Sequence, residues 1–124
     1  MSLEKYERVF SKTNNRCAYC GEFLLDQTVD HVHPIIKGGT YHTDNLLPCC
    51  KSCNELKSAL TIKQFRQEIF KIMQKKIIKV RKRWLKIRSV YKEKFPKATK
   101  PGHIVFLFEE KEKPVYASWK PFGF

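Results

Sequence analysis

The chain has 124 residues, and its 25 lysines and arginines outnumber its 12 acidic residues, for a formal net charge of +13. This length allows one domain, or one small domain with an appendage, and only a modest hydrophobic core. The charge points to a polyanionic partner, most commonly nucleic acid, although a solvated basic surface without a partner is the alternative. The sequence has no apolar signal segment at its start and no long uncharged apolar stretch to span a membrane. We therefore expect a cytoplasmic protein of bacterial or phage type, in which thiols stay reduced.

The first half of the chain predicts short elements joined by turns. Residues 1–16 predict a short helix or a turn, because their apolar residues follow helical spacing. Residues 23–25 and 28–29 predict a short hairpin with its turn at 26–27, and the glycine pair near residue 38 predicts a loop. A short extended stretch at 45–48 precedes a helix that begins near Lys51 or Ser52 and ends at about Ser58.

The second half predicts one long basic helix. No glycine or proline occurs from Cys49 to Phe95, and apolar residues recur every three or four positions from Ile62 to Tyr91. With an N-cap at Thr61 such a helix would be roughly 50 Å long, so we expect it to bend or split. The aromatic and β-branched runs at 104–108 and 115–119 predict a C-terminal β-hairpin.

The strongest motif is a double pair of cysteines, Cys17 with Cys20 and Cys50 with Cys53. Two C-x-x-C knuckles are typical of a closed four-thiolate zinc site. Zinc bound only by the folded chain adds its binding energy to folding, which a small core needs. The knuckles alone also fit a zinc ribbon without activity. Cys49 has the wrong spacing to Cys53 for a knuckle, so we interpret it as a buried thiol.

The segment between the knuckles carries side chains suited to phosphodiester hydrolysis. A hard cation prefers carboxylate and amide oxygens, which Asp30 and Asn54 can supply, and His31 can take a proton from water. Consecutive strand residues point to opposite faces, so Asp30 and His31 converge only if the backbone turns or a metal bridges them. The alternative is a capped turn with a surface histidine. His33 is either a metal or phosphate contact or a structural residue, and we expect His42 and His103 to be ordinary surface or packing residues.

These motifs, in their order, resemble the zinc-containing branch of the HNH endonucleases over about residues 14–60. The resemblance implies a ββα-metal core with a divalent cation, Mg²⁺ or Mn²⁺ and sometimes Ni²⁺ or Zn²⁺. It implies that Asp30 and Asn54 hold this cation and that His31 is the general base. It further implies that Asn45 holds the loop and the histidine in position. The matching residues are Cys17, Cys20, Gly21, Val29–Pro34, Lys37–Gly39, Asn45–Leu47, Cys50, Cys53, Asn54 and Lys57.

The basic residues of the second half predict contacts with the nucleic-acid backbone. Residues 61–95 contain thirteen lysines and arginines but only two acids, with the densest run between Lys75 and Arg88. Backbone contacts position a duplex and weaken with salt. The alternative is a solvated charge run, and for Lys57 a phosphate contact and a solvated side chain are equally open. The predicted contacts are Lys57, Arg81, Lys82, Arg83, Lys86 and Arg88.

Together these patterns predict an α+β protein in two regions. Residues 1–60 would form a ββα-metal core stapled by zinc, and residues 61–124 the basic helical region and hairpin. The predicted function is metal-dependent cleavage of DNA, most readily duplex DNA, by a monomer or homodimer. The alternatives are a zinc-stabilised nucleic-acid-binding module without catalysis and an interaction protein whose basic helix docks an acidic partner.

Overall fold

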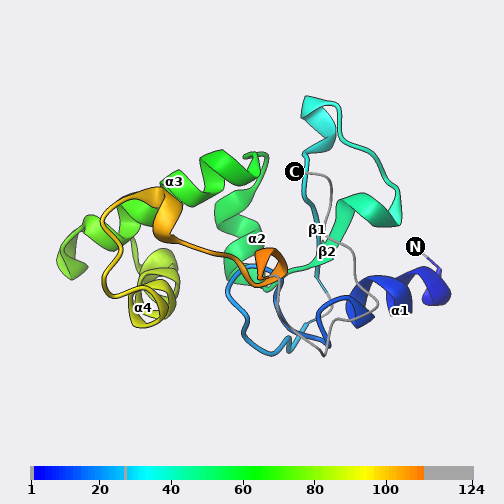
Figure 1. Cartoon of the computed structure of the whole chain (residues 1–124), viewed down its shortest axis with the longest axis horizontal. Coiled ribbons are helices and arrows are strands. Elements are labelled where there is room, and N and C mark those ends of the chain that lie inside the picture. The colour runs from blue at the N-terminus through cyan, green and yellow to red at the C-terminus, as the bar shows by residue number, and fades with distance from the viewer. Residues whose placement is uncertain (1, 27, 111–124) are drawn as a thin grey trace.

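The computed structural model describes residues 2–26 and 28–110 (Figure 1). Strands β1 (Val29–His31) and β2 (Leu46–Pro48) form a small antiparallel sheet in which His31 lies opposite Leu46. Helix α1 (Leu3–Ser11) precedes this sheet, and α2 (Lys51–Lys57), α3 (Ile62–Gln74) and α4 (Leu85–Lys94) follow it. The mixture of helices with a small sheet confirms the predicted α+β class. In the described part of the chain, no helix is long and apolar enough to cross a membrane.

The first three helices begin at side chains that cap them. Ser2 accepts a hydrogen bond from the Lys5 amide at the start of α1. Thr61 and Gln64 form a capping box at the start of α3. Such caps satisfy amide groups that the helix itself leaves unpaired. The short N-terminal helix and the helix predicted to begin near Lys51 or Ser52 are thereby confirmed, the latter as Lys51–Lys57.

The predicted hairpin between residues 23–25 and 28–29 is wrong. Val29 pairs with Pro48 in β2, and Phe23 forms an isolated bridge with Arg16. The distant pairing prevails because Leu46 and Leu47 are buried apolar partners for β1, whereas Leu25 is almost fully exposed. Two paired strands, β1 and β2, are thus followed directly by helix α2.

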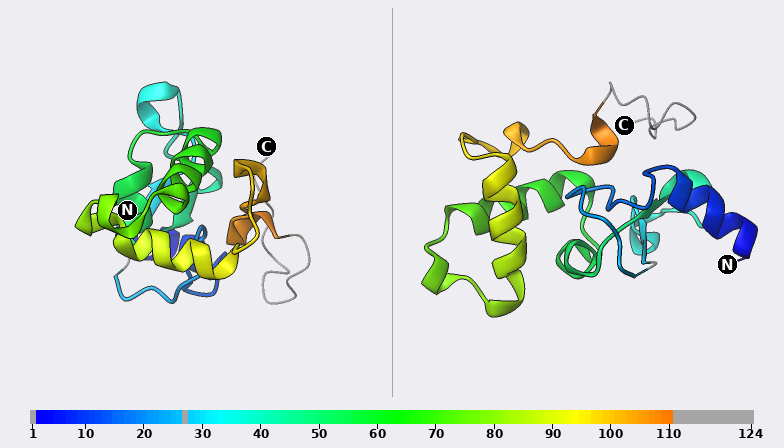
Figure 2. Two further views of the ribbon diagram at one scale, coloured as in Figure 1. Left: turned by 90° about the vertical axis from the view of Figure 1, so that its left-hand side faces the viewer. Right: turned by 90° about the horizontal axis from the view of Figure 1, so that it is seen from below.

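The predicted long helix splits into two. Helix α3 ends at Gln74, and 3₁₀ turns occupy Ile77–Lys79 and Lys82–Trp84. The chain then turns back, and α4 packs across α3 (Figures 1 and 2). A straight rod would leave the apolar stripe of its second half uncovered. Folding back buries Ile87 and Tyr91 in the core instead.

Residues 104–108 do not form the predicted strand. Residues 104–106 have no regular structure and Leu107–Glu109 is a 3₁₀ turn, while Val115–Trp119 lies outside the described residues. The segment leaves α4 and runs back to the first knuckle (Figure 2), where the Phe108 amide donates to the Ala18 carbonyl at 2.9 Å. The anchors are Phe106 and Phe108, both buried in the core.

One hydrophobic cluster joins the two predicted regions. Tyr19, from the first knuckle, contacts the rings of Phe65 and Phe106 edge-on, each at 5.2 Å between centroids. The cysteines and the buried residues of α3 and α4 belong to the same cluster. A separate small cluster of Val9, Phe10 and Leu46 holds α1 against β2. The predicted boundary near residue 60 falls in the link between α2 and α3.

Candidate metal centre and active site

The four predicted zinc cysteines come together. The Sγ atoms of Cys17, Cys20, Cys50 and Cys53 all lie within 4.8 Å of one another. Tetrahedral zinc with bonds of about 2.3 Å to sulfur requires sulfur atoms about 3.8 Å apart. The Sγ atoms of Cys20 and Cys50 are 3.8 Å apart, so the cluster fits a structural zinc ion. Cys49 is also buried, but its Sγ lies against the Cys50 carbonyl at 3.4 Å, as a packed thiol would.

Helix α4 supplies two contacts to this cluster that the sequence did not predict. The Tyr91 hydroxyl lies 3.5 Å from the Sγ of Cys53, and the Lys94 ammonium donates to the Cys20 carbonyl. Burial, reinforced by the nearby cysteines, raises the pKa of Tyr91 well above its usual value. Its hydroxyl therefore keeps its proton and can donate a hydrogen bond to a thiolate. The only sequence signal was the helical stripe, which marked Tyr91 as a packing residue.

Three of the four predicted catalytic residues, Asp30, His31 and Asn54, border one hollow of about 370 Å³. Strand β1 contributes the first two, and α2 contributes Asn54 one residue after Cys53. The strand ends at His31 and the chain bends at residues 32 and 33, which lets both β1 residues reach the hollow. The cysteine cluster fixes the start of α2, because the Cys50 sulfur accepts the Cys53 amide. The arrangement thus gathers a carboxylate, an imidazole and an amide beside the predicted zinc.

His31 is half-buried and rests on an aromatic neighbour. Its ring meets the ring of Tyr41 edge-on, with 5.2 Å between centroids and 84° between planes. The His31 carbonyl accepts a hydrogen bond from the Lys57 ammonium at 3.0 Å. These contacts fix the backbone and one side of the ring. Tyr41 is itself 66% exposed, and no feature of the sequence marked it as a neighbour of His31.

Asp30 lies in a buried ion pair. Its Oδ2 is 3.0 Å from the Lys57 ammonium and also accepts a hydrogen bond from the Tyr19 hydroxyl. Burial raises the pKa of the Asp30 carboxyl above its usual value, although Lys57 and the Tyr19 hydrogen bond oppose this rise. Asp30 still borders the hollow. A carboxylate has about four lone-pair sites, so the bonds to Lys57 and Tyr19 leave acceptor capacity for a further ligand.

The prediction that Lys57 contacts nucleic acid is wrong, and so is the solvated alternative. The Lys57 side chain has no exposed area, because its ammonium is held between Asp30 and the His31 carbonyl. A sequence signal for this position was present. Lys57 lies four residues after Cys53, so both occupy the inward face of α2.

Asn45 holds the loop that follows His31. Its Oδ1 accepts from the His33 amide at 2.9 Å, and its Nδ2 donates to the carbonyls of His33 and Thr40. Gly39 allows this loop to close, since a Cβ there would lie 1.8 Å from the His33 carbonyl oxygen. His33 is exposed and its Nε2 lies 2.8 Å from the Lys37 carbonyl, which gives it a contact within the loop. Asn45 does not border the hollow; it acts on the backbone beside it.

The remaining predicted nucleic-acid contacts lie apart from the hollow, on the turn before α4 and on α4 itself. Arg81, Lys82, Arg83 and Lys86 are exposed. Arg83 lies 3.9 Å from Glu55 of α2, and the Arg88 guanidinium donates to the Lys75 carbonyl at 3.0 Å. Contact of these four residues and Arg88 with DNA stays a prediction. His103 lies in a 3₁₀ turn after α4, and its Nδ1 accepts a hydrogen bond from the Thr99 amide.

A comparison with family models matches residues 17–60 to the family described as HNH endonuclease. No curated protein and no solved structure matches the chain. The matched range includes both cysteine pairs and all the residues predicted to be catalytic, namely Asp30, His31, Asn45 and Asn54. The match confirms the predicted resemblance and supports a nuclease-type function in general. Residues 17–60 of this chain are thus similar to the HNH endonucleases, and buried residues of α3, α4 and the segment 104–108 pack into one core with them.

Proposed function

We propose that this protein is a metal-dependent DNA endonuclease that hydrolyses phosphodiester bonds, with His31 as the general base. The observation that carries the proposal is the shared hollow of Asp30, His31 and Asn54, within the segment that matches the HNH endonucleases. Nucleases of this family act on DNA, and the net charge of +13 suits such a substrate. Cleavage of one strand per encounter, as a nick or as part of a double-strand cut, follows from a single site.

Asp30 and Asn54 are the residues that would hold the divalent cation. The donor set fits a hard ion, because it offers a carboxylate and an amide oxygen. The Asn54 side chain has no hydrogen bond to the residues that the structure describes, which leaves its oxygen free for a ligand. Such a cation supplies charge neutralisation at the scissile phosphate. Mg²⁺ and Mn²⁺ are the first candidates, followed by Ni²⁺ and Zn²⁺.

His31 would remove the proton from the attacking water. An imidazole exchanges protons near neutral pH, and a positioned general base contributes about 10²- to 10⁴-fold to a rate. The ring of Tyr41 and the Lys57 bond to the His31 carbonyl hold it in place. Asn45 would act through the loop, because its bonds to the His33 amide and the Thr40 carbonyl hold residues 33–40 in place beside the hollow.

The buried pair of Asp30 and Lys57 is the observation that favours the alternative, a zinc-stabilised nucleic-acid-binding module. An ammonium that already neutralises the carboxylate leaves less charge for a cation. The two functions differ in one measurement, which is cleavage.

We expect the purified protein to nick supercoiled plasmid DNA when Mg²⁺, Mn²⁺ or Ni²⁺ is added. His31→Ala should lower the cleavage rate at least 100-fold, because the general base is lost, while folding and DNA binding stay nearly unchanged. The rate is measured by gel from the loss of supercoiled DNA. His103→Ala is the matched control, since it removes a histidine remote from the hollow.

The metal requirement is best tested by omitting the cation from dialysed protein, because a chelator would also attack the cysteine cluster. Full-rate cleavage by His31→Ala would show that the base is assigned wrongly. Binding without cleavage under every cation would favour the binding module.

A further inference from the structure

A second groove begins next to the candidate active site, on the side of α1. It has a volume of about 640 Å³ and lies between α1 and the residues 40–43. The side chains that border it include Lys5, Arg8, Tyr41 and His42. The other three are hydroxyl residues, Ser2, Thr40 and Thr43, and none of the seven is acidic. Cations and hydroxyl groups together are the side chains that bind phosphate oxygens of a nucleic acid.

Tyr41 connects this groove to His31. Its ring contacts the His31 ring, and its carbonyl accepts a hydrogen bond from the Lys5 ammonium at 2.8 Å. The groove is therefore separated from the candidate general base by one side chain. A strand whose scissile phosphate lies at His31 would reach the groove with its next phosphates.

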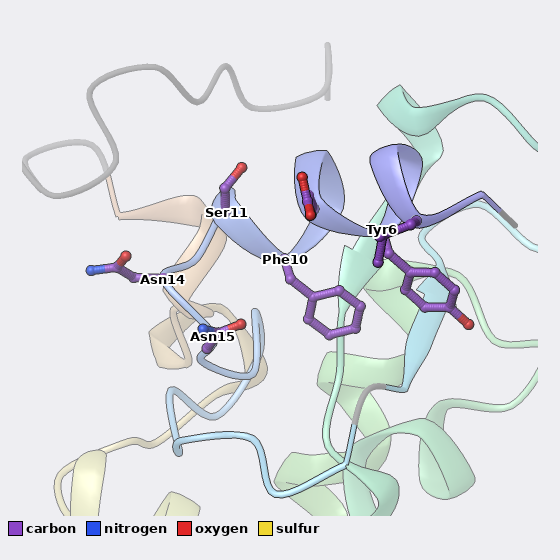
Figure 3. A pocket seen from close by; sticks show the side chains of 7 residues that line it. Tyr6, Phe10, Ser11, Asn14 and Asn15 are labelled. Atoms are coloured by element: carbon purple, nitrogen blue, oxygen red, sulfur yellow. The ribbon is translucent and has the colours of Figure 1, made fainter.

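The charge of the groove depends on which face of α1 borders it. Lys5 and Arg8 are three residues apart and share one face of the helix. The opposite face borders a hollow of about 300 Å³ whose lining includes Tyr6, Phe10, Asn14 and Asn15, together with Glu7 (Figure 3). That lining contains no lysine, arginine or histidine. The cations of α1 therefore gather on the side that faces Tyr41.

Arg8 is available to a ligand. Its guanidinium lies 3.9 Å from Glu4, but the Arg8 side chain is 66% exposed and that of Glu4 81%. An ion pair so exposed adds little stability and yields readily to a phosphate.

We propose that the groove of Lys5, Arg8, Tyr41 and His42 binds the phosphate backbone of DNA next to the scissile phosphate. This rests on the proposed function for the position of the scissile bond. It adds a second contact surface, since α1 and the basic run of residues 75–88 lie toward opposite ends of the molecule (Figure 1). The duplex would then be held on both sides of the hollow.

The test is the salt dependence of binding to a fluorescently labelled DNA duplex, measured by anisotropy without added divalent cation. Each lost phosphate contact reduces the slope of log affinity against log salt by about 0.9. We expect a reduction of about 1.8 for Lys5→Gln/Arg8→Gln, and of about 0.9 for Arg8→Gln alone. Lys5 also donates a hydrogen bond to the Tyr41 carbonyl, so its removal could loosen the loop of residues 40–43. Arg8→Gln alone keeps this bond and tests the loss of a phosphate contact separately.

The matched control is Lys97→Gln/Lys100→Gln, which removes the same charge from an exposed segment after α4. Its slope should equal that of the unaltered protein. Equal slopes for the two double variants would overturn the inference, and so would a protein that does not bind the duplex. Binding with the expected slopes but without cleavage would support the groove and overturn the proposed nuclease activity, so the two failures are distinct.

Discussion

A lysine whose side chain is fully buried lies at the centre of the candidate site. Lys57 neutralises Asp30 at 3.0 Å and also holds the backbone of His31. Tyr19 links this pair to the aromatic core, because its ring packs on Phe65 while its hydroxyl donates to Asp30. The carboxylate that would bind a cation is therefore positioned by the same contacts that build the core.

Lys57→Met should destabilise the protein by about 3–5 kcal/mol, because it leaves the Asp30 charge buried without its partner. Urea unfolding at a fixed zinc concentration measures the loss. Burial already raises the pKa of Asp30, so the folded variant binds a proton at a pH where the unfolded chain has released it. The loss should therefore shrink as the pH falls and grow as it rises.

The double variant Lys57→Met/Asp30→Asn is the control for this pair. It removes both charges and keeps an oxygen for the Tyr19 hydroxyl, so it should recover much of the lost stability. Equal unfolding midpoints for the single and double variants would show that the buried charge is not the cause.

At the scale of elements, α4 connects the cysteine cluster to the hydrophobic core. Helix α4 packs against α3 and reaches the second knuckle through Tyr91 and the first through Lys94. Gly21 lies directly under Lys94, and a Cβ at residue 21 would come within 2.7 Å of its ammonium. Helix α4, and with it the basic helical region, is therefore attached to the cysteine cluster.

Tyr91→Phe should weaken zinc binding by about 10-fold or more, because hydrogen bonds to metal ligands orient them and tune their basicity. Competition with a coloured zinc chelator measures the affinity. Tyr6→Phe is the matched control, since Tyr6 lies on α1 beside Phe10 and away from the cysteines. An unchanged zinc affinity for Tyr91→Phe would mean that its hydroxyl does not support the cluster.

At the scale of the whole molecule, the sequence predicted the parts that a local pattern specifies. The cysteine spacing predicted the cluster, and apolar periodicity predicted α1 and the helical character of residues 62–91. The same periodicity continues through Lys75–Trp84 without glycine or proline, so nothing local marks the break between α3 and α4. The pairing of Val29 with Pro48 and the burial of Lys57 depend on contacts between distant residues. Position in the fold, not residue type, decides such features.

Zinc removal should affect the two ends of the molecule differently. The cysteine cluster contacts α2 and α4, and the 107–108 segment bonds the first knuckle, whereas α1 packs on β2 through its own small cluster. Stripping the metal should therefore raise amide hydrogen exchange first in residues 17–20, α2, α4 and 107–108, and less in α1, because local opening follows local contacts. Hydrogen-exchange mass spectrometry of the zinc-loaded and stripped protein measures the difference, and restored zinc should restore protection. Equal loss in α1 and α4 would instead mean that the metal holds one cooperative unit, and unchanged exchange in α4 would mean that α4 does not depend on the cluster.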